Sequence, residues 1–143
     1  FVMPTVSALL WKNMMFHPVY GMFAAISAAL GLPPIDWFRD YPMTAIIIIL
    51  TWQWMPFAFL ILLTSIQSVD SEQKEAAKID GAKPWHIFVY IILPHLKRSI
   101  SVVVMIEAIF LLSAFAEIHI TTSGGPGNAT TNLTYFVFLR GIA

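Results

Sequence analysis

The chain has 143 residues, of which 58% are hydrophobic and 11% are charged, and its formal net charge at pH 7 is zero. Soluble domains carry about 25% charged residues, so this composition predicts a membrane protein. A neutral chain gives no electrostatic reason to bind nucleic acid, and the absence of Cys excludes disulfides, thiolate metal sites and cysteine nucleophiles.

The first part of the chain mixes apolar residues with turn residues. It opens on an apolar stretch that is too short to span a bilayer and lacks the basic region of a signal peptide. We interpret residues 1–16 as the end of a helix that begins upstream, which makes the chain a fragment. Residues 17–42 are expected to form an outer loop with a short apolar helix around Met22 to Leu30. Trp37 and Tyr41 would anchor this loop at the membrane interface.

Two long apolar segments are predicted to cross the membrane. Residues 43–64 carry no formal charge and would form about 33 Å of helix, enough for a hydrocarbon core of about 30 Å. Residues 99–118 are similar but contain Glu107 and Glu117. Residues 119–143 follow as an outer Gly/Pro/Asn-rich loop and the start of another helix. The predicted fold is therefore an all-α membrane protein, a bundle of transmembrane helices.

The basic residues predict the orientation of these spans. Residues 65–98 contain five of the eight Lys and Arg residues, whereas the loops on the opposite side contain only Arg39 and Arg140. Cytoplasmic loops of membrane proteins are enriched in Lys and Arg, so we expect residues 65–98 to lie in the cytoplasm. The five basic residues of this loop are Lys74, Lys78, Lys83, Lys97 and Arg98.

The loop 65–98 has the local signals of two short helices. Asp70 can cap the first helix, with Gln73 reaching back as in a capping box. Gly81 would end that helix in the left-handed region, and Pro84 suits the first turn of the second helix, which we expect Pro94 to end. One apolar face of the second helix, which would anchor it to the bundle, consists of Trp85, Phe88 and Ile92. The residues alone favour equally a docking element for a partner and an ordinary solvated loop.

The stretch EAAKIDGAKPWHIFVYIILP resembles the EAA loop of binding-protein-dependent ABC importer permeases: Glu-Ala-Ala, three residues, Gly, nine residues, then Ile-x-Leu-Pro. The resemblance implies that this helix-turn-helix couples the permease to an ATPase. The coupling residues would be Glu75, Ala76, Ala77, Asp80, Gly81, Ile91, Leu93 and Pro94. IDGAKPWHIF and LPPIDW resemble the carbohydrate branch of the family, and TTSGGPGNATTNLTY is most similar to permeases for polyols such as sorbitol or mannitol.

The same resemblance implies the setting in which the chain works. The permease would lie in a bacterial plasma (inner) membrane as a multi-pass protein, with cytoplasmic ATPase subunits, a second permease subunit and an external substrate-binding protein as partners. ATP and Mg²⁺ would bind to the ATPase, so the chain itself is expected to hold no cofactor and no catalytic residue. The four His residues lie on three different loops without ligand spacing, so we expect no metal site.

Several polar or aromatic residues within the predicted spans are candidates for the substrate path. The candidates on the first span are Trp52, Gln53 and Trp54, which lie at mid-membrane. They could form a polar, aromatic patch on which a sugar stacks. Alternatively, they pack helices together, and Gln53 then forms a hydrogen bond across the bundle. One tryptophan would flank the path and the other would pack on a neighbouring helix. The candidates on the second span are Glu107, Ser113 and Glu117, and we expect Ser113 and Glu117 to share one helix face.

Two other classes of function compete with the importer. A charge such as Glu107 in the middle of a span costs about 2.5–3.5 kcal/mol on insertion scales, so Glu107 must face a cavity, face a partner or stay protonated. An ion-coupled secondary transporter would use Glu107 as its coupling site. A membrane-embedded hydrolase would need a nucleophile and a base, and no motif positions such a pair.

Overall fold

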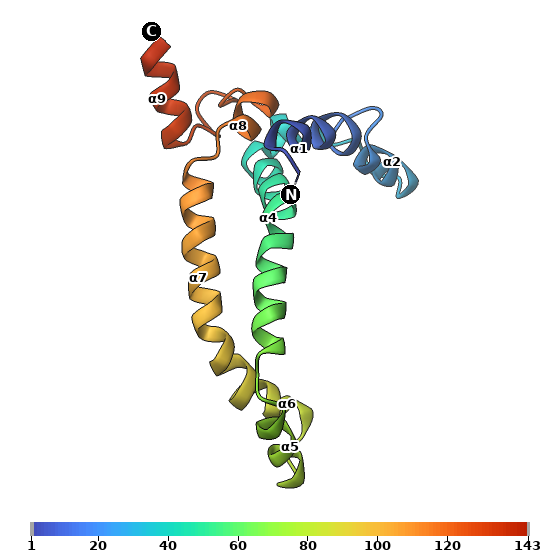
Figure 1. Cartoon of the computed structure of the whole chain (residues 1–143). Helices are drawn as coiled ribbons and strands as arrows, with labels where there is room; N and C mark the ends of the chain where they lie inside the picture. Colours follow the sequence, from blue (N-terminus) through green and yellow to red (C-terminus); the bar gives the residue numbers. More distant parts are fainter. Residues whose placement is uncertain (1, 143) are drawn as a thin grey trace. The chain divides into compact units, whose positions relative to one another are not determined.

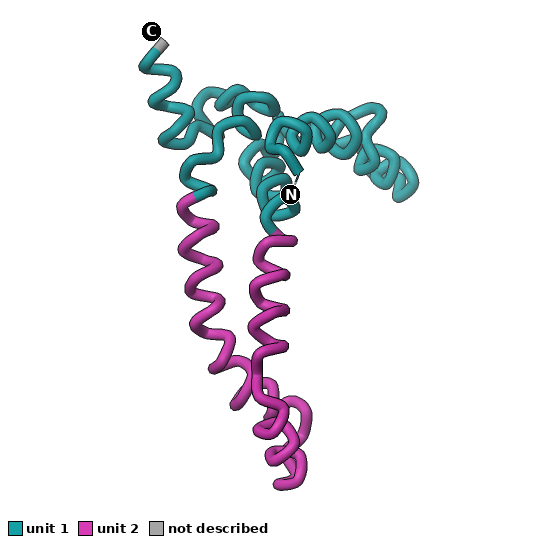
Figure 2. The backbone as a smooth tube through the Cα atoms, viewed as in Figure 1, with its two compact units in different colours: residues 1–54, 110–143 teal, residues 55–109 magenta. Residues whose placement is uncertain are grey.

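The computed structural model describes residues 2–142, and the regular structure of these residues is entirely helical, as the sequence predicts (Figure 1). The chain divides into two compact units (Figure 2). Unit 1 comprises residues 1–54 and 110–143, and unit 2 comprises residues 55–109.

Nine α-helices and two π-helices (η1 and η2) account for this structure in the described residues. Two of the long helices, α4 and α7, contribute residues to both units. In chain order, the elements are α1 (Pro4–Leu10), η1 (Trp11–Met15), α2 (Met22–Ala29), α3 (Trp37–Asp40), α4 (Pro42–Gln67), α5 (Ser71–Ile79), α6 (Pro84–Ile87), η2 (Phe88–Ile92), α7 (Leu93–Leu112), α8 (Ala116–Thr121) and α9 (Leu133–Ile142).

An aromatic cluster forms the core of the first part of unit 1. Phe16 is 1% exposed, and its ring centroid lies 5.3 Å from the ring centroids of Trp11 and Trp37 and 5.4 Å from that of Phe23. Trp37 therefore packs within the protein, which differs from the expected role as an interface anchor. Tyr41 is 55% exposed and remains available for such a role. Ring–ring packing explains the difference, because several large apolar rings bury more surface together than one ring does alone.

The second predicted span ends earlier than the sequence indicates. The helix α7 stops at Leu112 rather than continuing to residue 118, and residues 113–115 are not helical before α8 begins. Two side chains satisfy the carbonyl groups that this break leaves free. The amide of Asn132 donates to the carbonyl oxygen of Ala114, and Thr134 Oγ1 donates to that of Leu112 at 3.0 Å. Because these donors come from a distant segment, a break is tolerated where the local sequence carries no breaker.

Unit 2 consists mainly of α4 and α7 running side by side (Figure 2). The Ser99 hydroxyl donates to the Ser65 hydroxyl at 2.8 Å and joins the two helices. The predicted span 43–64 lies within α4, whose 26 residues form about 39 Å of helix. Pro56 lies inside this helix without ending it.

The second helix of the loop continues into the next span, contrary to the expectation that Pro94 would end it. α6, η2 and α7 follow one another as one helix of 29 residues. Proline lacks an N–H group, and its ring clashes with the carbonyl group four residues earlier in a regular α-helix. The π-helical turn over Phe88–Ile92 lies directly before this position, and its wider turn relieves the clash.

These two long helices have the length and composition of membrane spans. Pro42–Gln67 and Pro84–Leu112 both qualify among the described residues. Large apolar side chains such as those of Ile47, Phe59 and Met105 are 54%, 62% and 66% exposed. Apolar surface of this extent is unfavourable in water but suits contact with lipid or with another membrane helix.

We predict that Asn132→Ala destabilises the protein by about 1–3 kcal/mol. Its amide group donates to the carbonyl oxygen of Ala114, and its Oδ1 accepts a hydrogen bond from the N–H of Tyr135 at 2.9 Å. Both bonds are lost in the variant. Thermal unfolding of the full-length protein in detergent measures the effect. Asn128, which is exposed, supplies the control: Asn128→Ala should change stability by less than about 0.5 kcal/mol. Equal effects of the two substitutions would contradict the capping role.

Candidate functional site

The first candidate site is the helix α5 at one end of unit 2 (Figure 1). The Asp70 carboxylate accepts a hydrogen bond from the N–H of Glu72 at 2.9 Å and caps the helix, as the sequence predicts. Glu75 and Ala76 are exposed, and Ala77 is half-buried. The motif residues therefore present a carboxylate beside small methyl groups, and small groups allow the backbone of a partner to approach closely.

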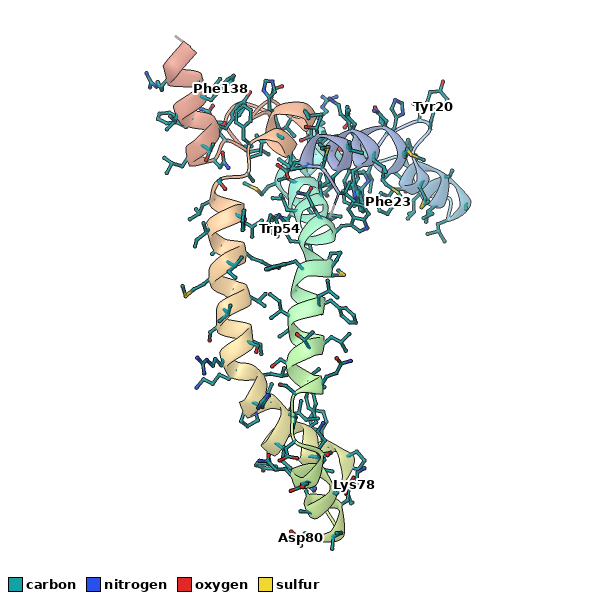
Figure 3. The ribbon with its side chains drawn as sticks, viewed as in Figure 1. Tyr20, Phe23, Trp54, Lys78, Asp80 and Phe138 are labelled. Carbon is teal, nitrogen blue, oxygen red and sulfur yellow. The ribbon has the colours of Figure 1, made fainter. Side chains whose placement is uncertain are left out.

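Gly81 ends α5 with a defined joint. Its φ is +81°, a conformation that glycine adopts without strain and that costs other residues about 1–2 kcal/mol. The N–H of Gly81 donates to the carbonyl oxygen of Lys78 at 3.0 Å, and the N–H of Ala82 donates to that of Ala77 at 2.9 Å. These two bonds form a Schellman motif, which fixes the direction in which the chain leaves the helix. Asp80, the C-cap residue, is exposed at the tip of the loop (Figure 3).

The second half of the motif begins at Pro84, the first residue of α6, as expected. The apolar face of this helix differs from the predicted one. Trp85 is 70% exposed and Phe88 is 40% exposed, and their rings stack on each other with centroids 5.7 Å apart. Ile87, which is 7% exposed, is the buried residue of α6. Contacts with residues distant in sequence decide which face of this helix is covered, and the local periodicity does not record them, so the predicted face differs from the buried one.

The last three motif residues lie where η2 passes into α7. Ile91 is half-buried, whereas Leu93 and Pro94 are exposed. Leu93 and Pro94 line an open pocket of 440 Å³ together with Lys97 and Ile100. The coupling residues predicted from the sequence thus all lie in unit 2, mostly on its surface.

The second candidate site is a buried polar pair in unit 1. Gln53 on α4 is 6% exposed and Glu117 on α8 is 3% exposed, and Gln53 Nε2 donates to Glu117 Oε1 at 3.0 Å. Gln53 Oε1 is buried and has no hydrogen-bond partner in the described part of the chain. Polar groups buried in this way are usually fully hydrogen-bonded. The pair matches the alternative in which Gln53 bonds across the bundle.

An open pocket of 290 Å³ adjoins this pair. Gln53, Glu117, Trp54, Phe110 and Ser113 contribute to its lining. The ring of Trp54, which is labelled in Figure 3, stacks on the ring of Phe110 with centroids 4.7 Å apart. Ser113 is exposed. The structure therefore brings four of the six predicted path residues to one place in unit 1. Ser113 and Glu117 reach the pocket from different segments rather than from one helix face, because α7 ends before Ser113.

The remaining two path candidates lie elsewhere. Trp52 is 39% exposed, and its ring meets the ring of Trp11 edge-on with centroids 5.8 Å apart. This arrangement resembles the expected division in which one tryptophan packs on a neighbouring helix. Glu107 belongs to unit 2, where it is half-buried. Its Oε1 is buried and has no hydrogen-bond partner among the described residues.

Sequence reasoning missed the contribution of the first helix to unit 1. Lys12 Nζ donates to the carbonyl oxygen of Ile120 at 2.8 Å, which links the start of the chain to the end of α8. Ser7 on α1 is completely buried, and Pro4 joins the lining of the 290 Å³ pocket. These contacts are distant in sequence, and no motif in either segment indicates them.

We predict that Gln53→Leu destabilises the protein by about 1.5–3 kcal/mol, because it leaves the buried Glu117 carboxylate without its donor. Replacing both partners, Gln53→Leu with Glu117→Leu, should recover much of this loss, since an unpaired buried group is more unfavourable than two apolar ones. Gln67→Leu, at the exposed end of the same helix, is the matched control. Thermal unfolding of the full-length protein measures all three variants, and an effect of Gln53→Leu no larger than that of Gln67→Leu would contradict the pairing.

Comparisons with known proteins match almost the whole chain. Residues 2–139 match the family described as "Binding-protein-dependent transport system inner membrane component". A probable ABC transporter permease protein of Sinorhizobium fredii is 33% identical over 141 residues, which cover 98% of this chain and 45% of that protein. The trehalose/maltose transport system permease protein of Thermococcus litoralis is 37% identical over 139 residues, covering 94% and 46%.

A third relative has another sugar in its name. The lactose transport system permease protein of Rhizobium radiobacter is 30% identical over 145 residues, covering 95% of this chain and 49% of that protein. The chain thus spans about half the length of these relatives. The match to the family model extends over both units and includes the loop with the EAA motif. The chain therefore belongs to the family of binding-protein-dependent transport system inner membrane components.

Proposed function

We propose that the chain is part of the membrane subunit of an ATP-driven sugar importer, in which residues 65–98 couple transport to a cytoplasmic ATPase. One observation carries the proposal: α5 is an exposed helix that carries the EAA motif and ends in the Gly81 joint. An exposed helix of small residues offers a docking surface. Its fixed joint allows a displacement of the helix to be passed on rather than absorbed.

The path of that displacement follows from the continuity of the next helix. Beyond the joint, Pro84–Leu112 is one helix of 29 residues that includes a membrane span. A helix transmits force along its axis because its backbone hydrogen bonds hold successive turns together. A movement of α5 driven by closure of the ATPase would therefore reach the span directly. This is the physical basis for proposing alternating access, with ATP and Mg²⁺ held by the ATPase and not by this chain.

The partners and the substrate class are part of the same proposal. Relatives of the chain are named for the transport of trehalose and maltose and of lactose, which supports a sugar as substrate. The narrower expectation of a polyol rests on the resemblance of residues 121–135 alone. The complete importer would include a second permease subunit and an external substrate-binding protein. Its setting would be a bacterial inner membrane, with residues 65–98 in the cytoplasm because of their basic residues.

Family membership does not favour the ion-coupled alternative. The two classes differ in their source of energy, so depleting ATP while maintaining the membrane potential separates them. Uptake should stop in an ATP-driven importer and continue in an ion-coupled transporter. Glu107 Oε1 is buried and has no hydrogen-bond partner within residues 2–142. Such a group is unfavourable, and a role of Glu107 in the substrate path is the explanation that we propose.

Gly81→Val should lower ATP-dependent uptake or release the ATPase from the membrane, because a β-branched residue resists a φ of +81°. An added Cβ at Gly81 would meet no atom within 4 Å, so the effect is conformational rather than a clash. Gly81→Asn should retain function, since Asn tolerates this region better. Uptake in cells and ATPase retained on washed membranes are the measurements.

Gly31 provides a matched control for this experiment. It has a φ of +72° and open space around its Cβ position. It also ends α2 with the same motif, in which the N–H of Leu32 donates to the carbonyl oxygen of Ser27 at 2.8 Å. Gly31→Val carries the same local strain but lies outside the coupling loop, so it should leave ATPase recruitment intact. If Gly81→Val and Gly31→Val behave alike in both assays, the coupling assignment is wrong.

Glu107→Gln should change the rate of uptake while the complex remains assembled, because the substitution keeps the shape of the side chain and removes only its charge. Copurification of the subunits reports assembly, and uptake reports the path. Dissociation of the complex would instead identify Glu107 as a structural partner, in conflict with its proposed place in the substrate path.

A further inference from the structure

A polar pocket between α4 and α7 in unit 2 is not used by the proposed coupling mechanism. The pocket is open, has a volume of 490 Å³ and lies where α4 ends and α7 begins. Two helix faces meet in it. Ile61, Thr64 and Ser65 recur at the spacing of one face of α4, and His95, Arg98 and Ser99 recur likewise on α7. Ser68, just after the end of α4, completes the lining.

The hydroxyl groups of the pocket are already engaged with the protein. Ser99 Oγ donates to Ser65 Oγ at 2.8 Å, and Thr64 Oγ1 lies 2.9 Å from the carbonyl oxygen of Ile61. Ser68 Oγ donates to the carbonyl oxygen of Ser65 at 2.8 Å and lies 3.0 Å from His95 Nε2, which positions the imidazole. These bonds order the lining before any ligand binds. Ser65 Oγ, which accepts the bond from Ser99, keeps its own hydrogen for donation to a ligand.

The Arg98 guanidinium supplies the unused donors. It carries five N–H groups, and within the described part of the chain it forms no ion pair. No Asp or Glu belongs to the described lining, so its formal charge comes from Arg98 and, when protonated, from His95. A ligand that satisfies this site must therefore accept several hydrogen bonds and carry negative charge.

From these features we infer that the pocket binds a phosphate group. A planar guanidinium binds phosphate oxygens in pairs. Because His95 Nε2 is engaged with Ser68, the imidazole adds a further donor only in its doubly protonated form. Two sources can present this chemistry: the headgroup of an anionic phospholipid in the cytoplasmic leaflet, or a soluble phosphate. Basic pockets between membrane helices on the cytoplasmic side suit anionic headgroups. The apolar Ile61 side chain in the lining suits the lipid end of such a ligand.

Occupancy of the pocket would act at the base of the coupling loop. Ser68 precedes Asp70, the cap of α5, by two residues, and His95 and Arg98 belong to the first turns of α7. A phosphate held by Arg98 and His95 beside Ser68 therefore braces α4 against α7 at the point where the loop begins. The ligand would stabilise this pair of helices.

The test uses the full-length protein purified with its partner subunits. Wild-type complex in phosphatidylglycerol-containing membranes should retain phosphatidylglycerol through purification, as measured by lipid mass spectrometry. Arg98→Gln should retain about tenfold less, the effect expected from losing charge-assisted hydrogen bonds. Lys97→Gln removes the same charge one residue away but from the lining of the 440 Å³ pocket, so it should retain the wild-type amount. Equal losses in the two variants would overturn the site.

A second measurement distinguishes the two sources of phosphate. In phosphatidylcholine nanodiscs, either added phosphatidylglycerol or inorganic phosphate should raise the unfolding midpoint by about 2–4 °C, and Arg98→Gln should abolish the shift. A shift with phosphatidylglycerol alone identifies the headgroup, and a shift with inorganic phosphate identifies a soluble ligand. If neither raises the midpoint, the pocket binds no phosphate. Both measurements are independent of transport, so their failure leaves the coupling proposal intact, and a negative Gly81 experiment leaves the pocket intact.

Discussion

A lipid bilayer offers no water to backbone N–H and C=O groups, and this constraint accounts for most features of the chain. The long helices satisfy most of their own backbone groups, and two of their irregularities have an identifiable remedy. A π-helical turn precedes Pro94 where the proline ring would clash, and the break after Leu112 is closed by donors from Asn132 and Thr134. At the break after Leu112, the protein thus supplies partners for the irregular backbone.

The same constraint explains where the polar side chains of the spans lie. Gln53 on α4 and Glu117 on α8 form a hydrogen bond with each other, so these polar groups pair within the protein instead of facing lipid. The pocket beside them has an aromatic wall in Trp54 and Phe110. A polar pair that is already half-satisfied, next to open space, can serve both as a packing contact and as part of a path. Packing and transport are therefore compatible roles for this pair.

Local side-chain chemistry explains which features the sequence could predict. Asp70, Gly81 and Pro84 act within their own turns, so their roles as cap, stop and helix start could be predicted from the residues and appear in the structure. The end of α7 and the partner of Gln53 depend on residues 18 to 64 positions away. No local pattern specifies such contacts. The face of α6 belongs with the second group, because contacts with distant residues rather than the local periodicity make Ile87 the buried residue.

The π-helical turn at Phe88–Ile92 also determines how the side-chain faces of α6 and α7 are rotated relative to each other about the helix axis. Each residue of an α-helix turns the chain by about 100°, so the faces of α6 and α7 are related by the number of residues between them and by how tightly these are wound. A π turn takes up an additional residue without rotating the helix beyond it. The turn therefore acts as a spacer that fixes how the residues of α6 are rotated about the helix axis relative to the residues of α7. Converting it to regular α-helix without removing a residue would rotate one end against the other, even with every side chain at both ends unchanged.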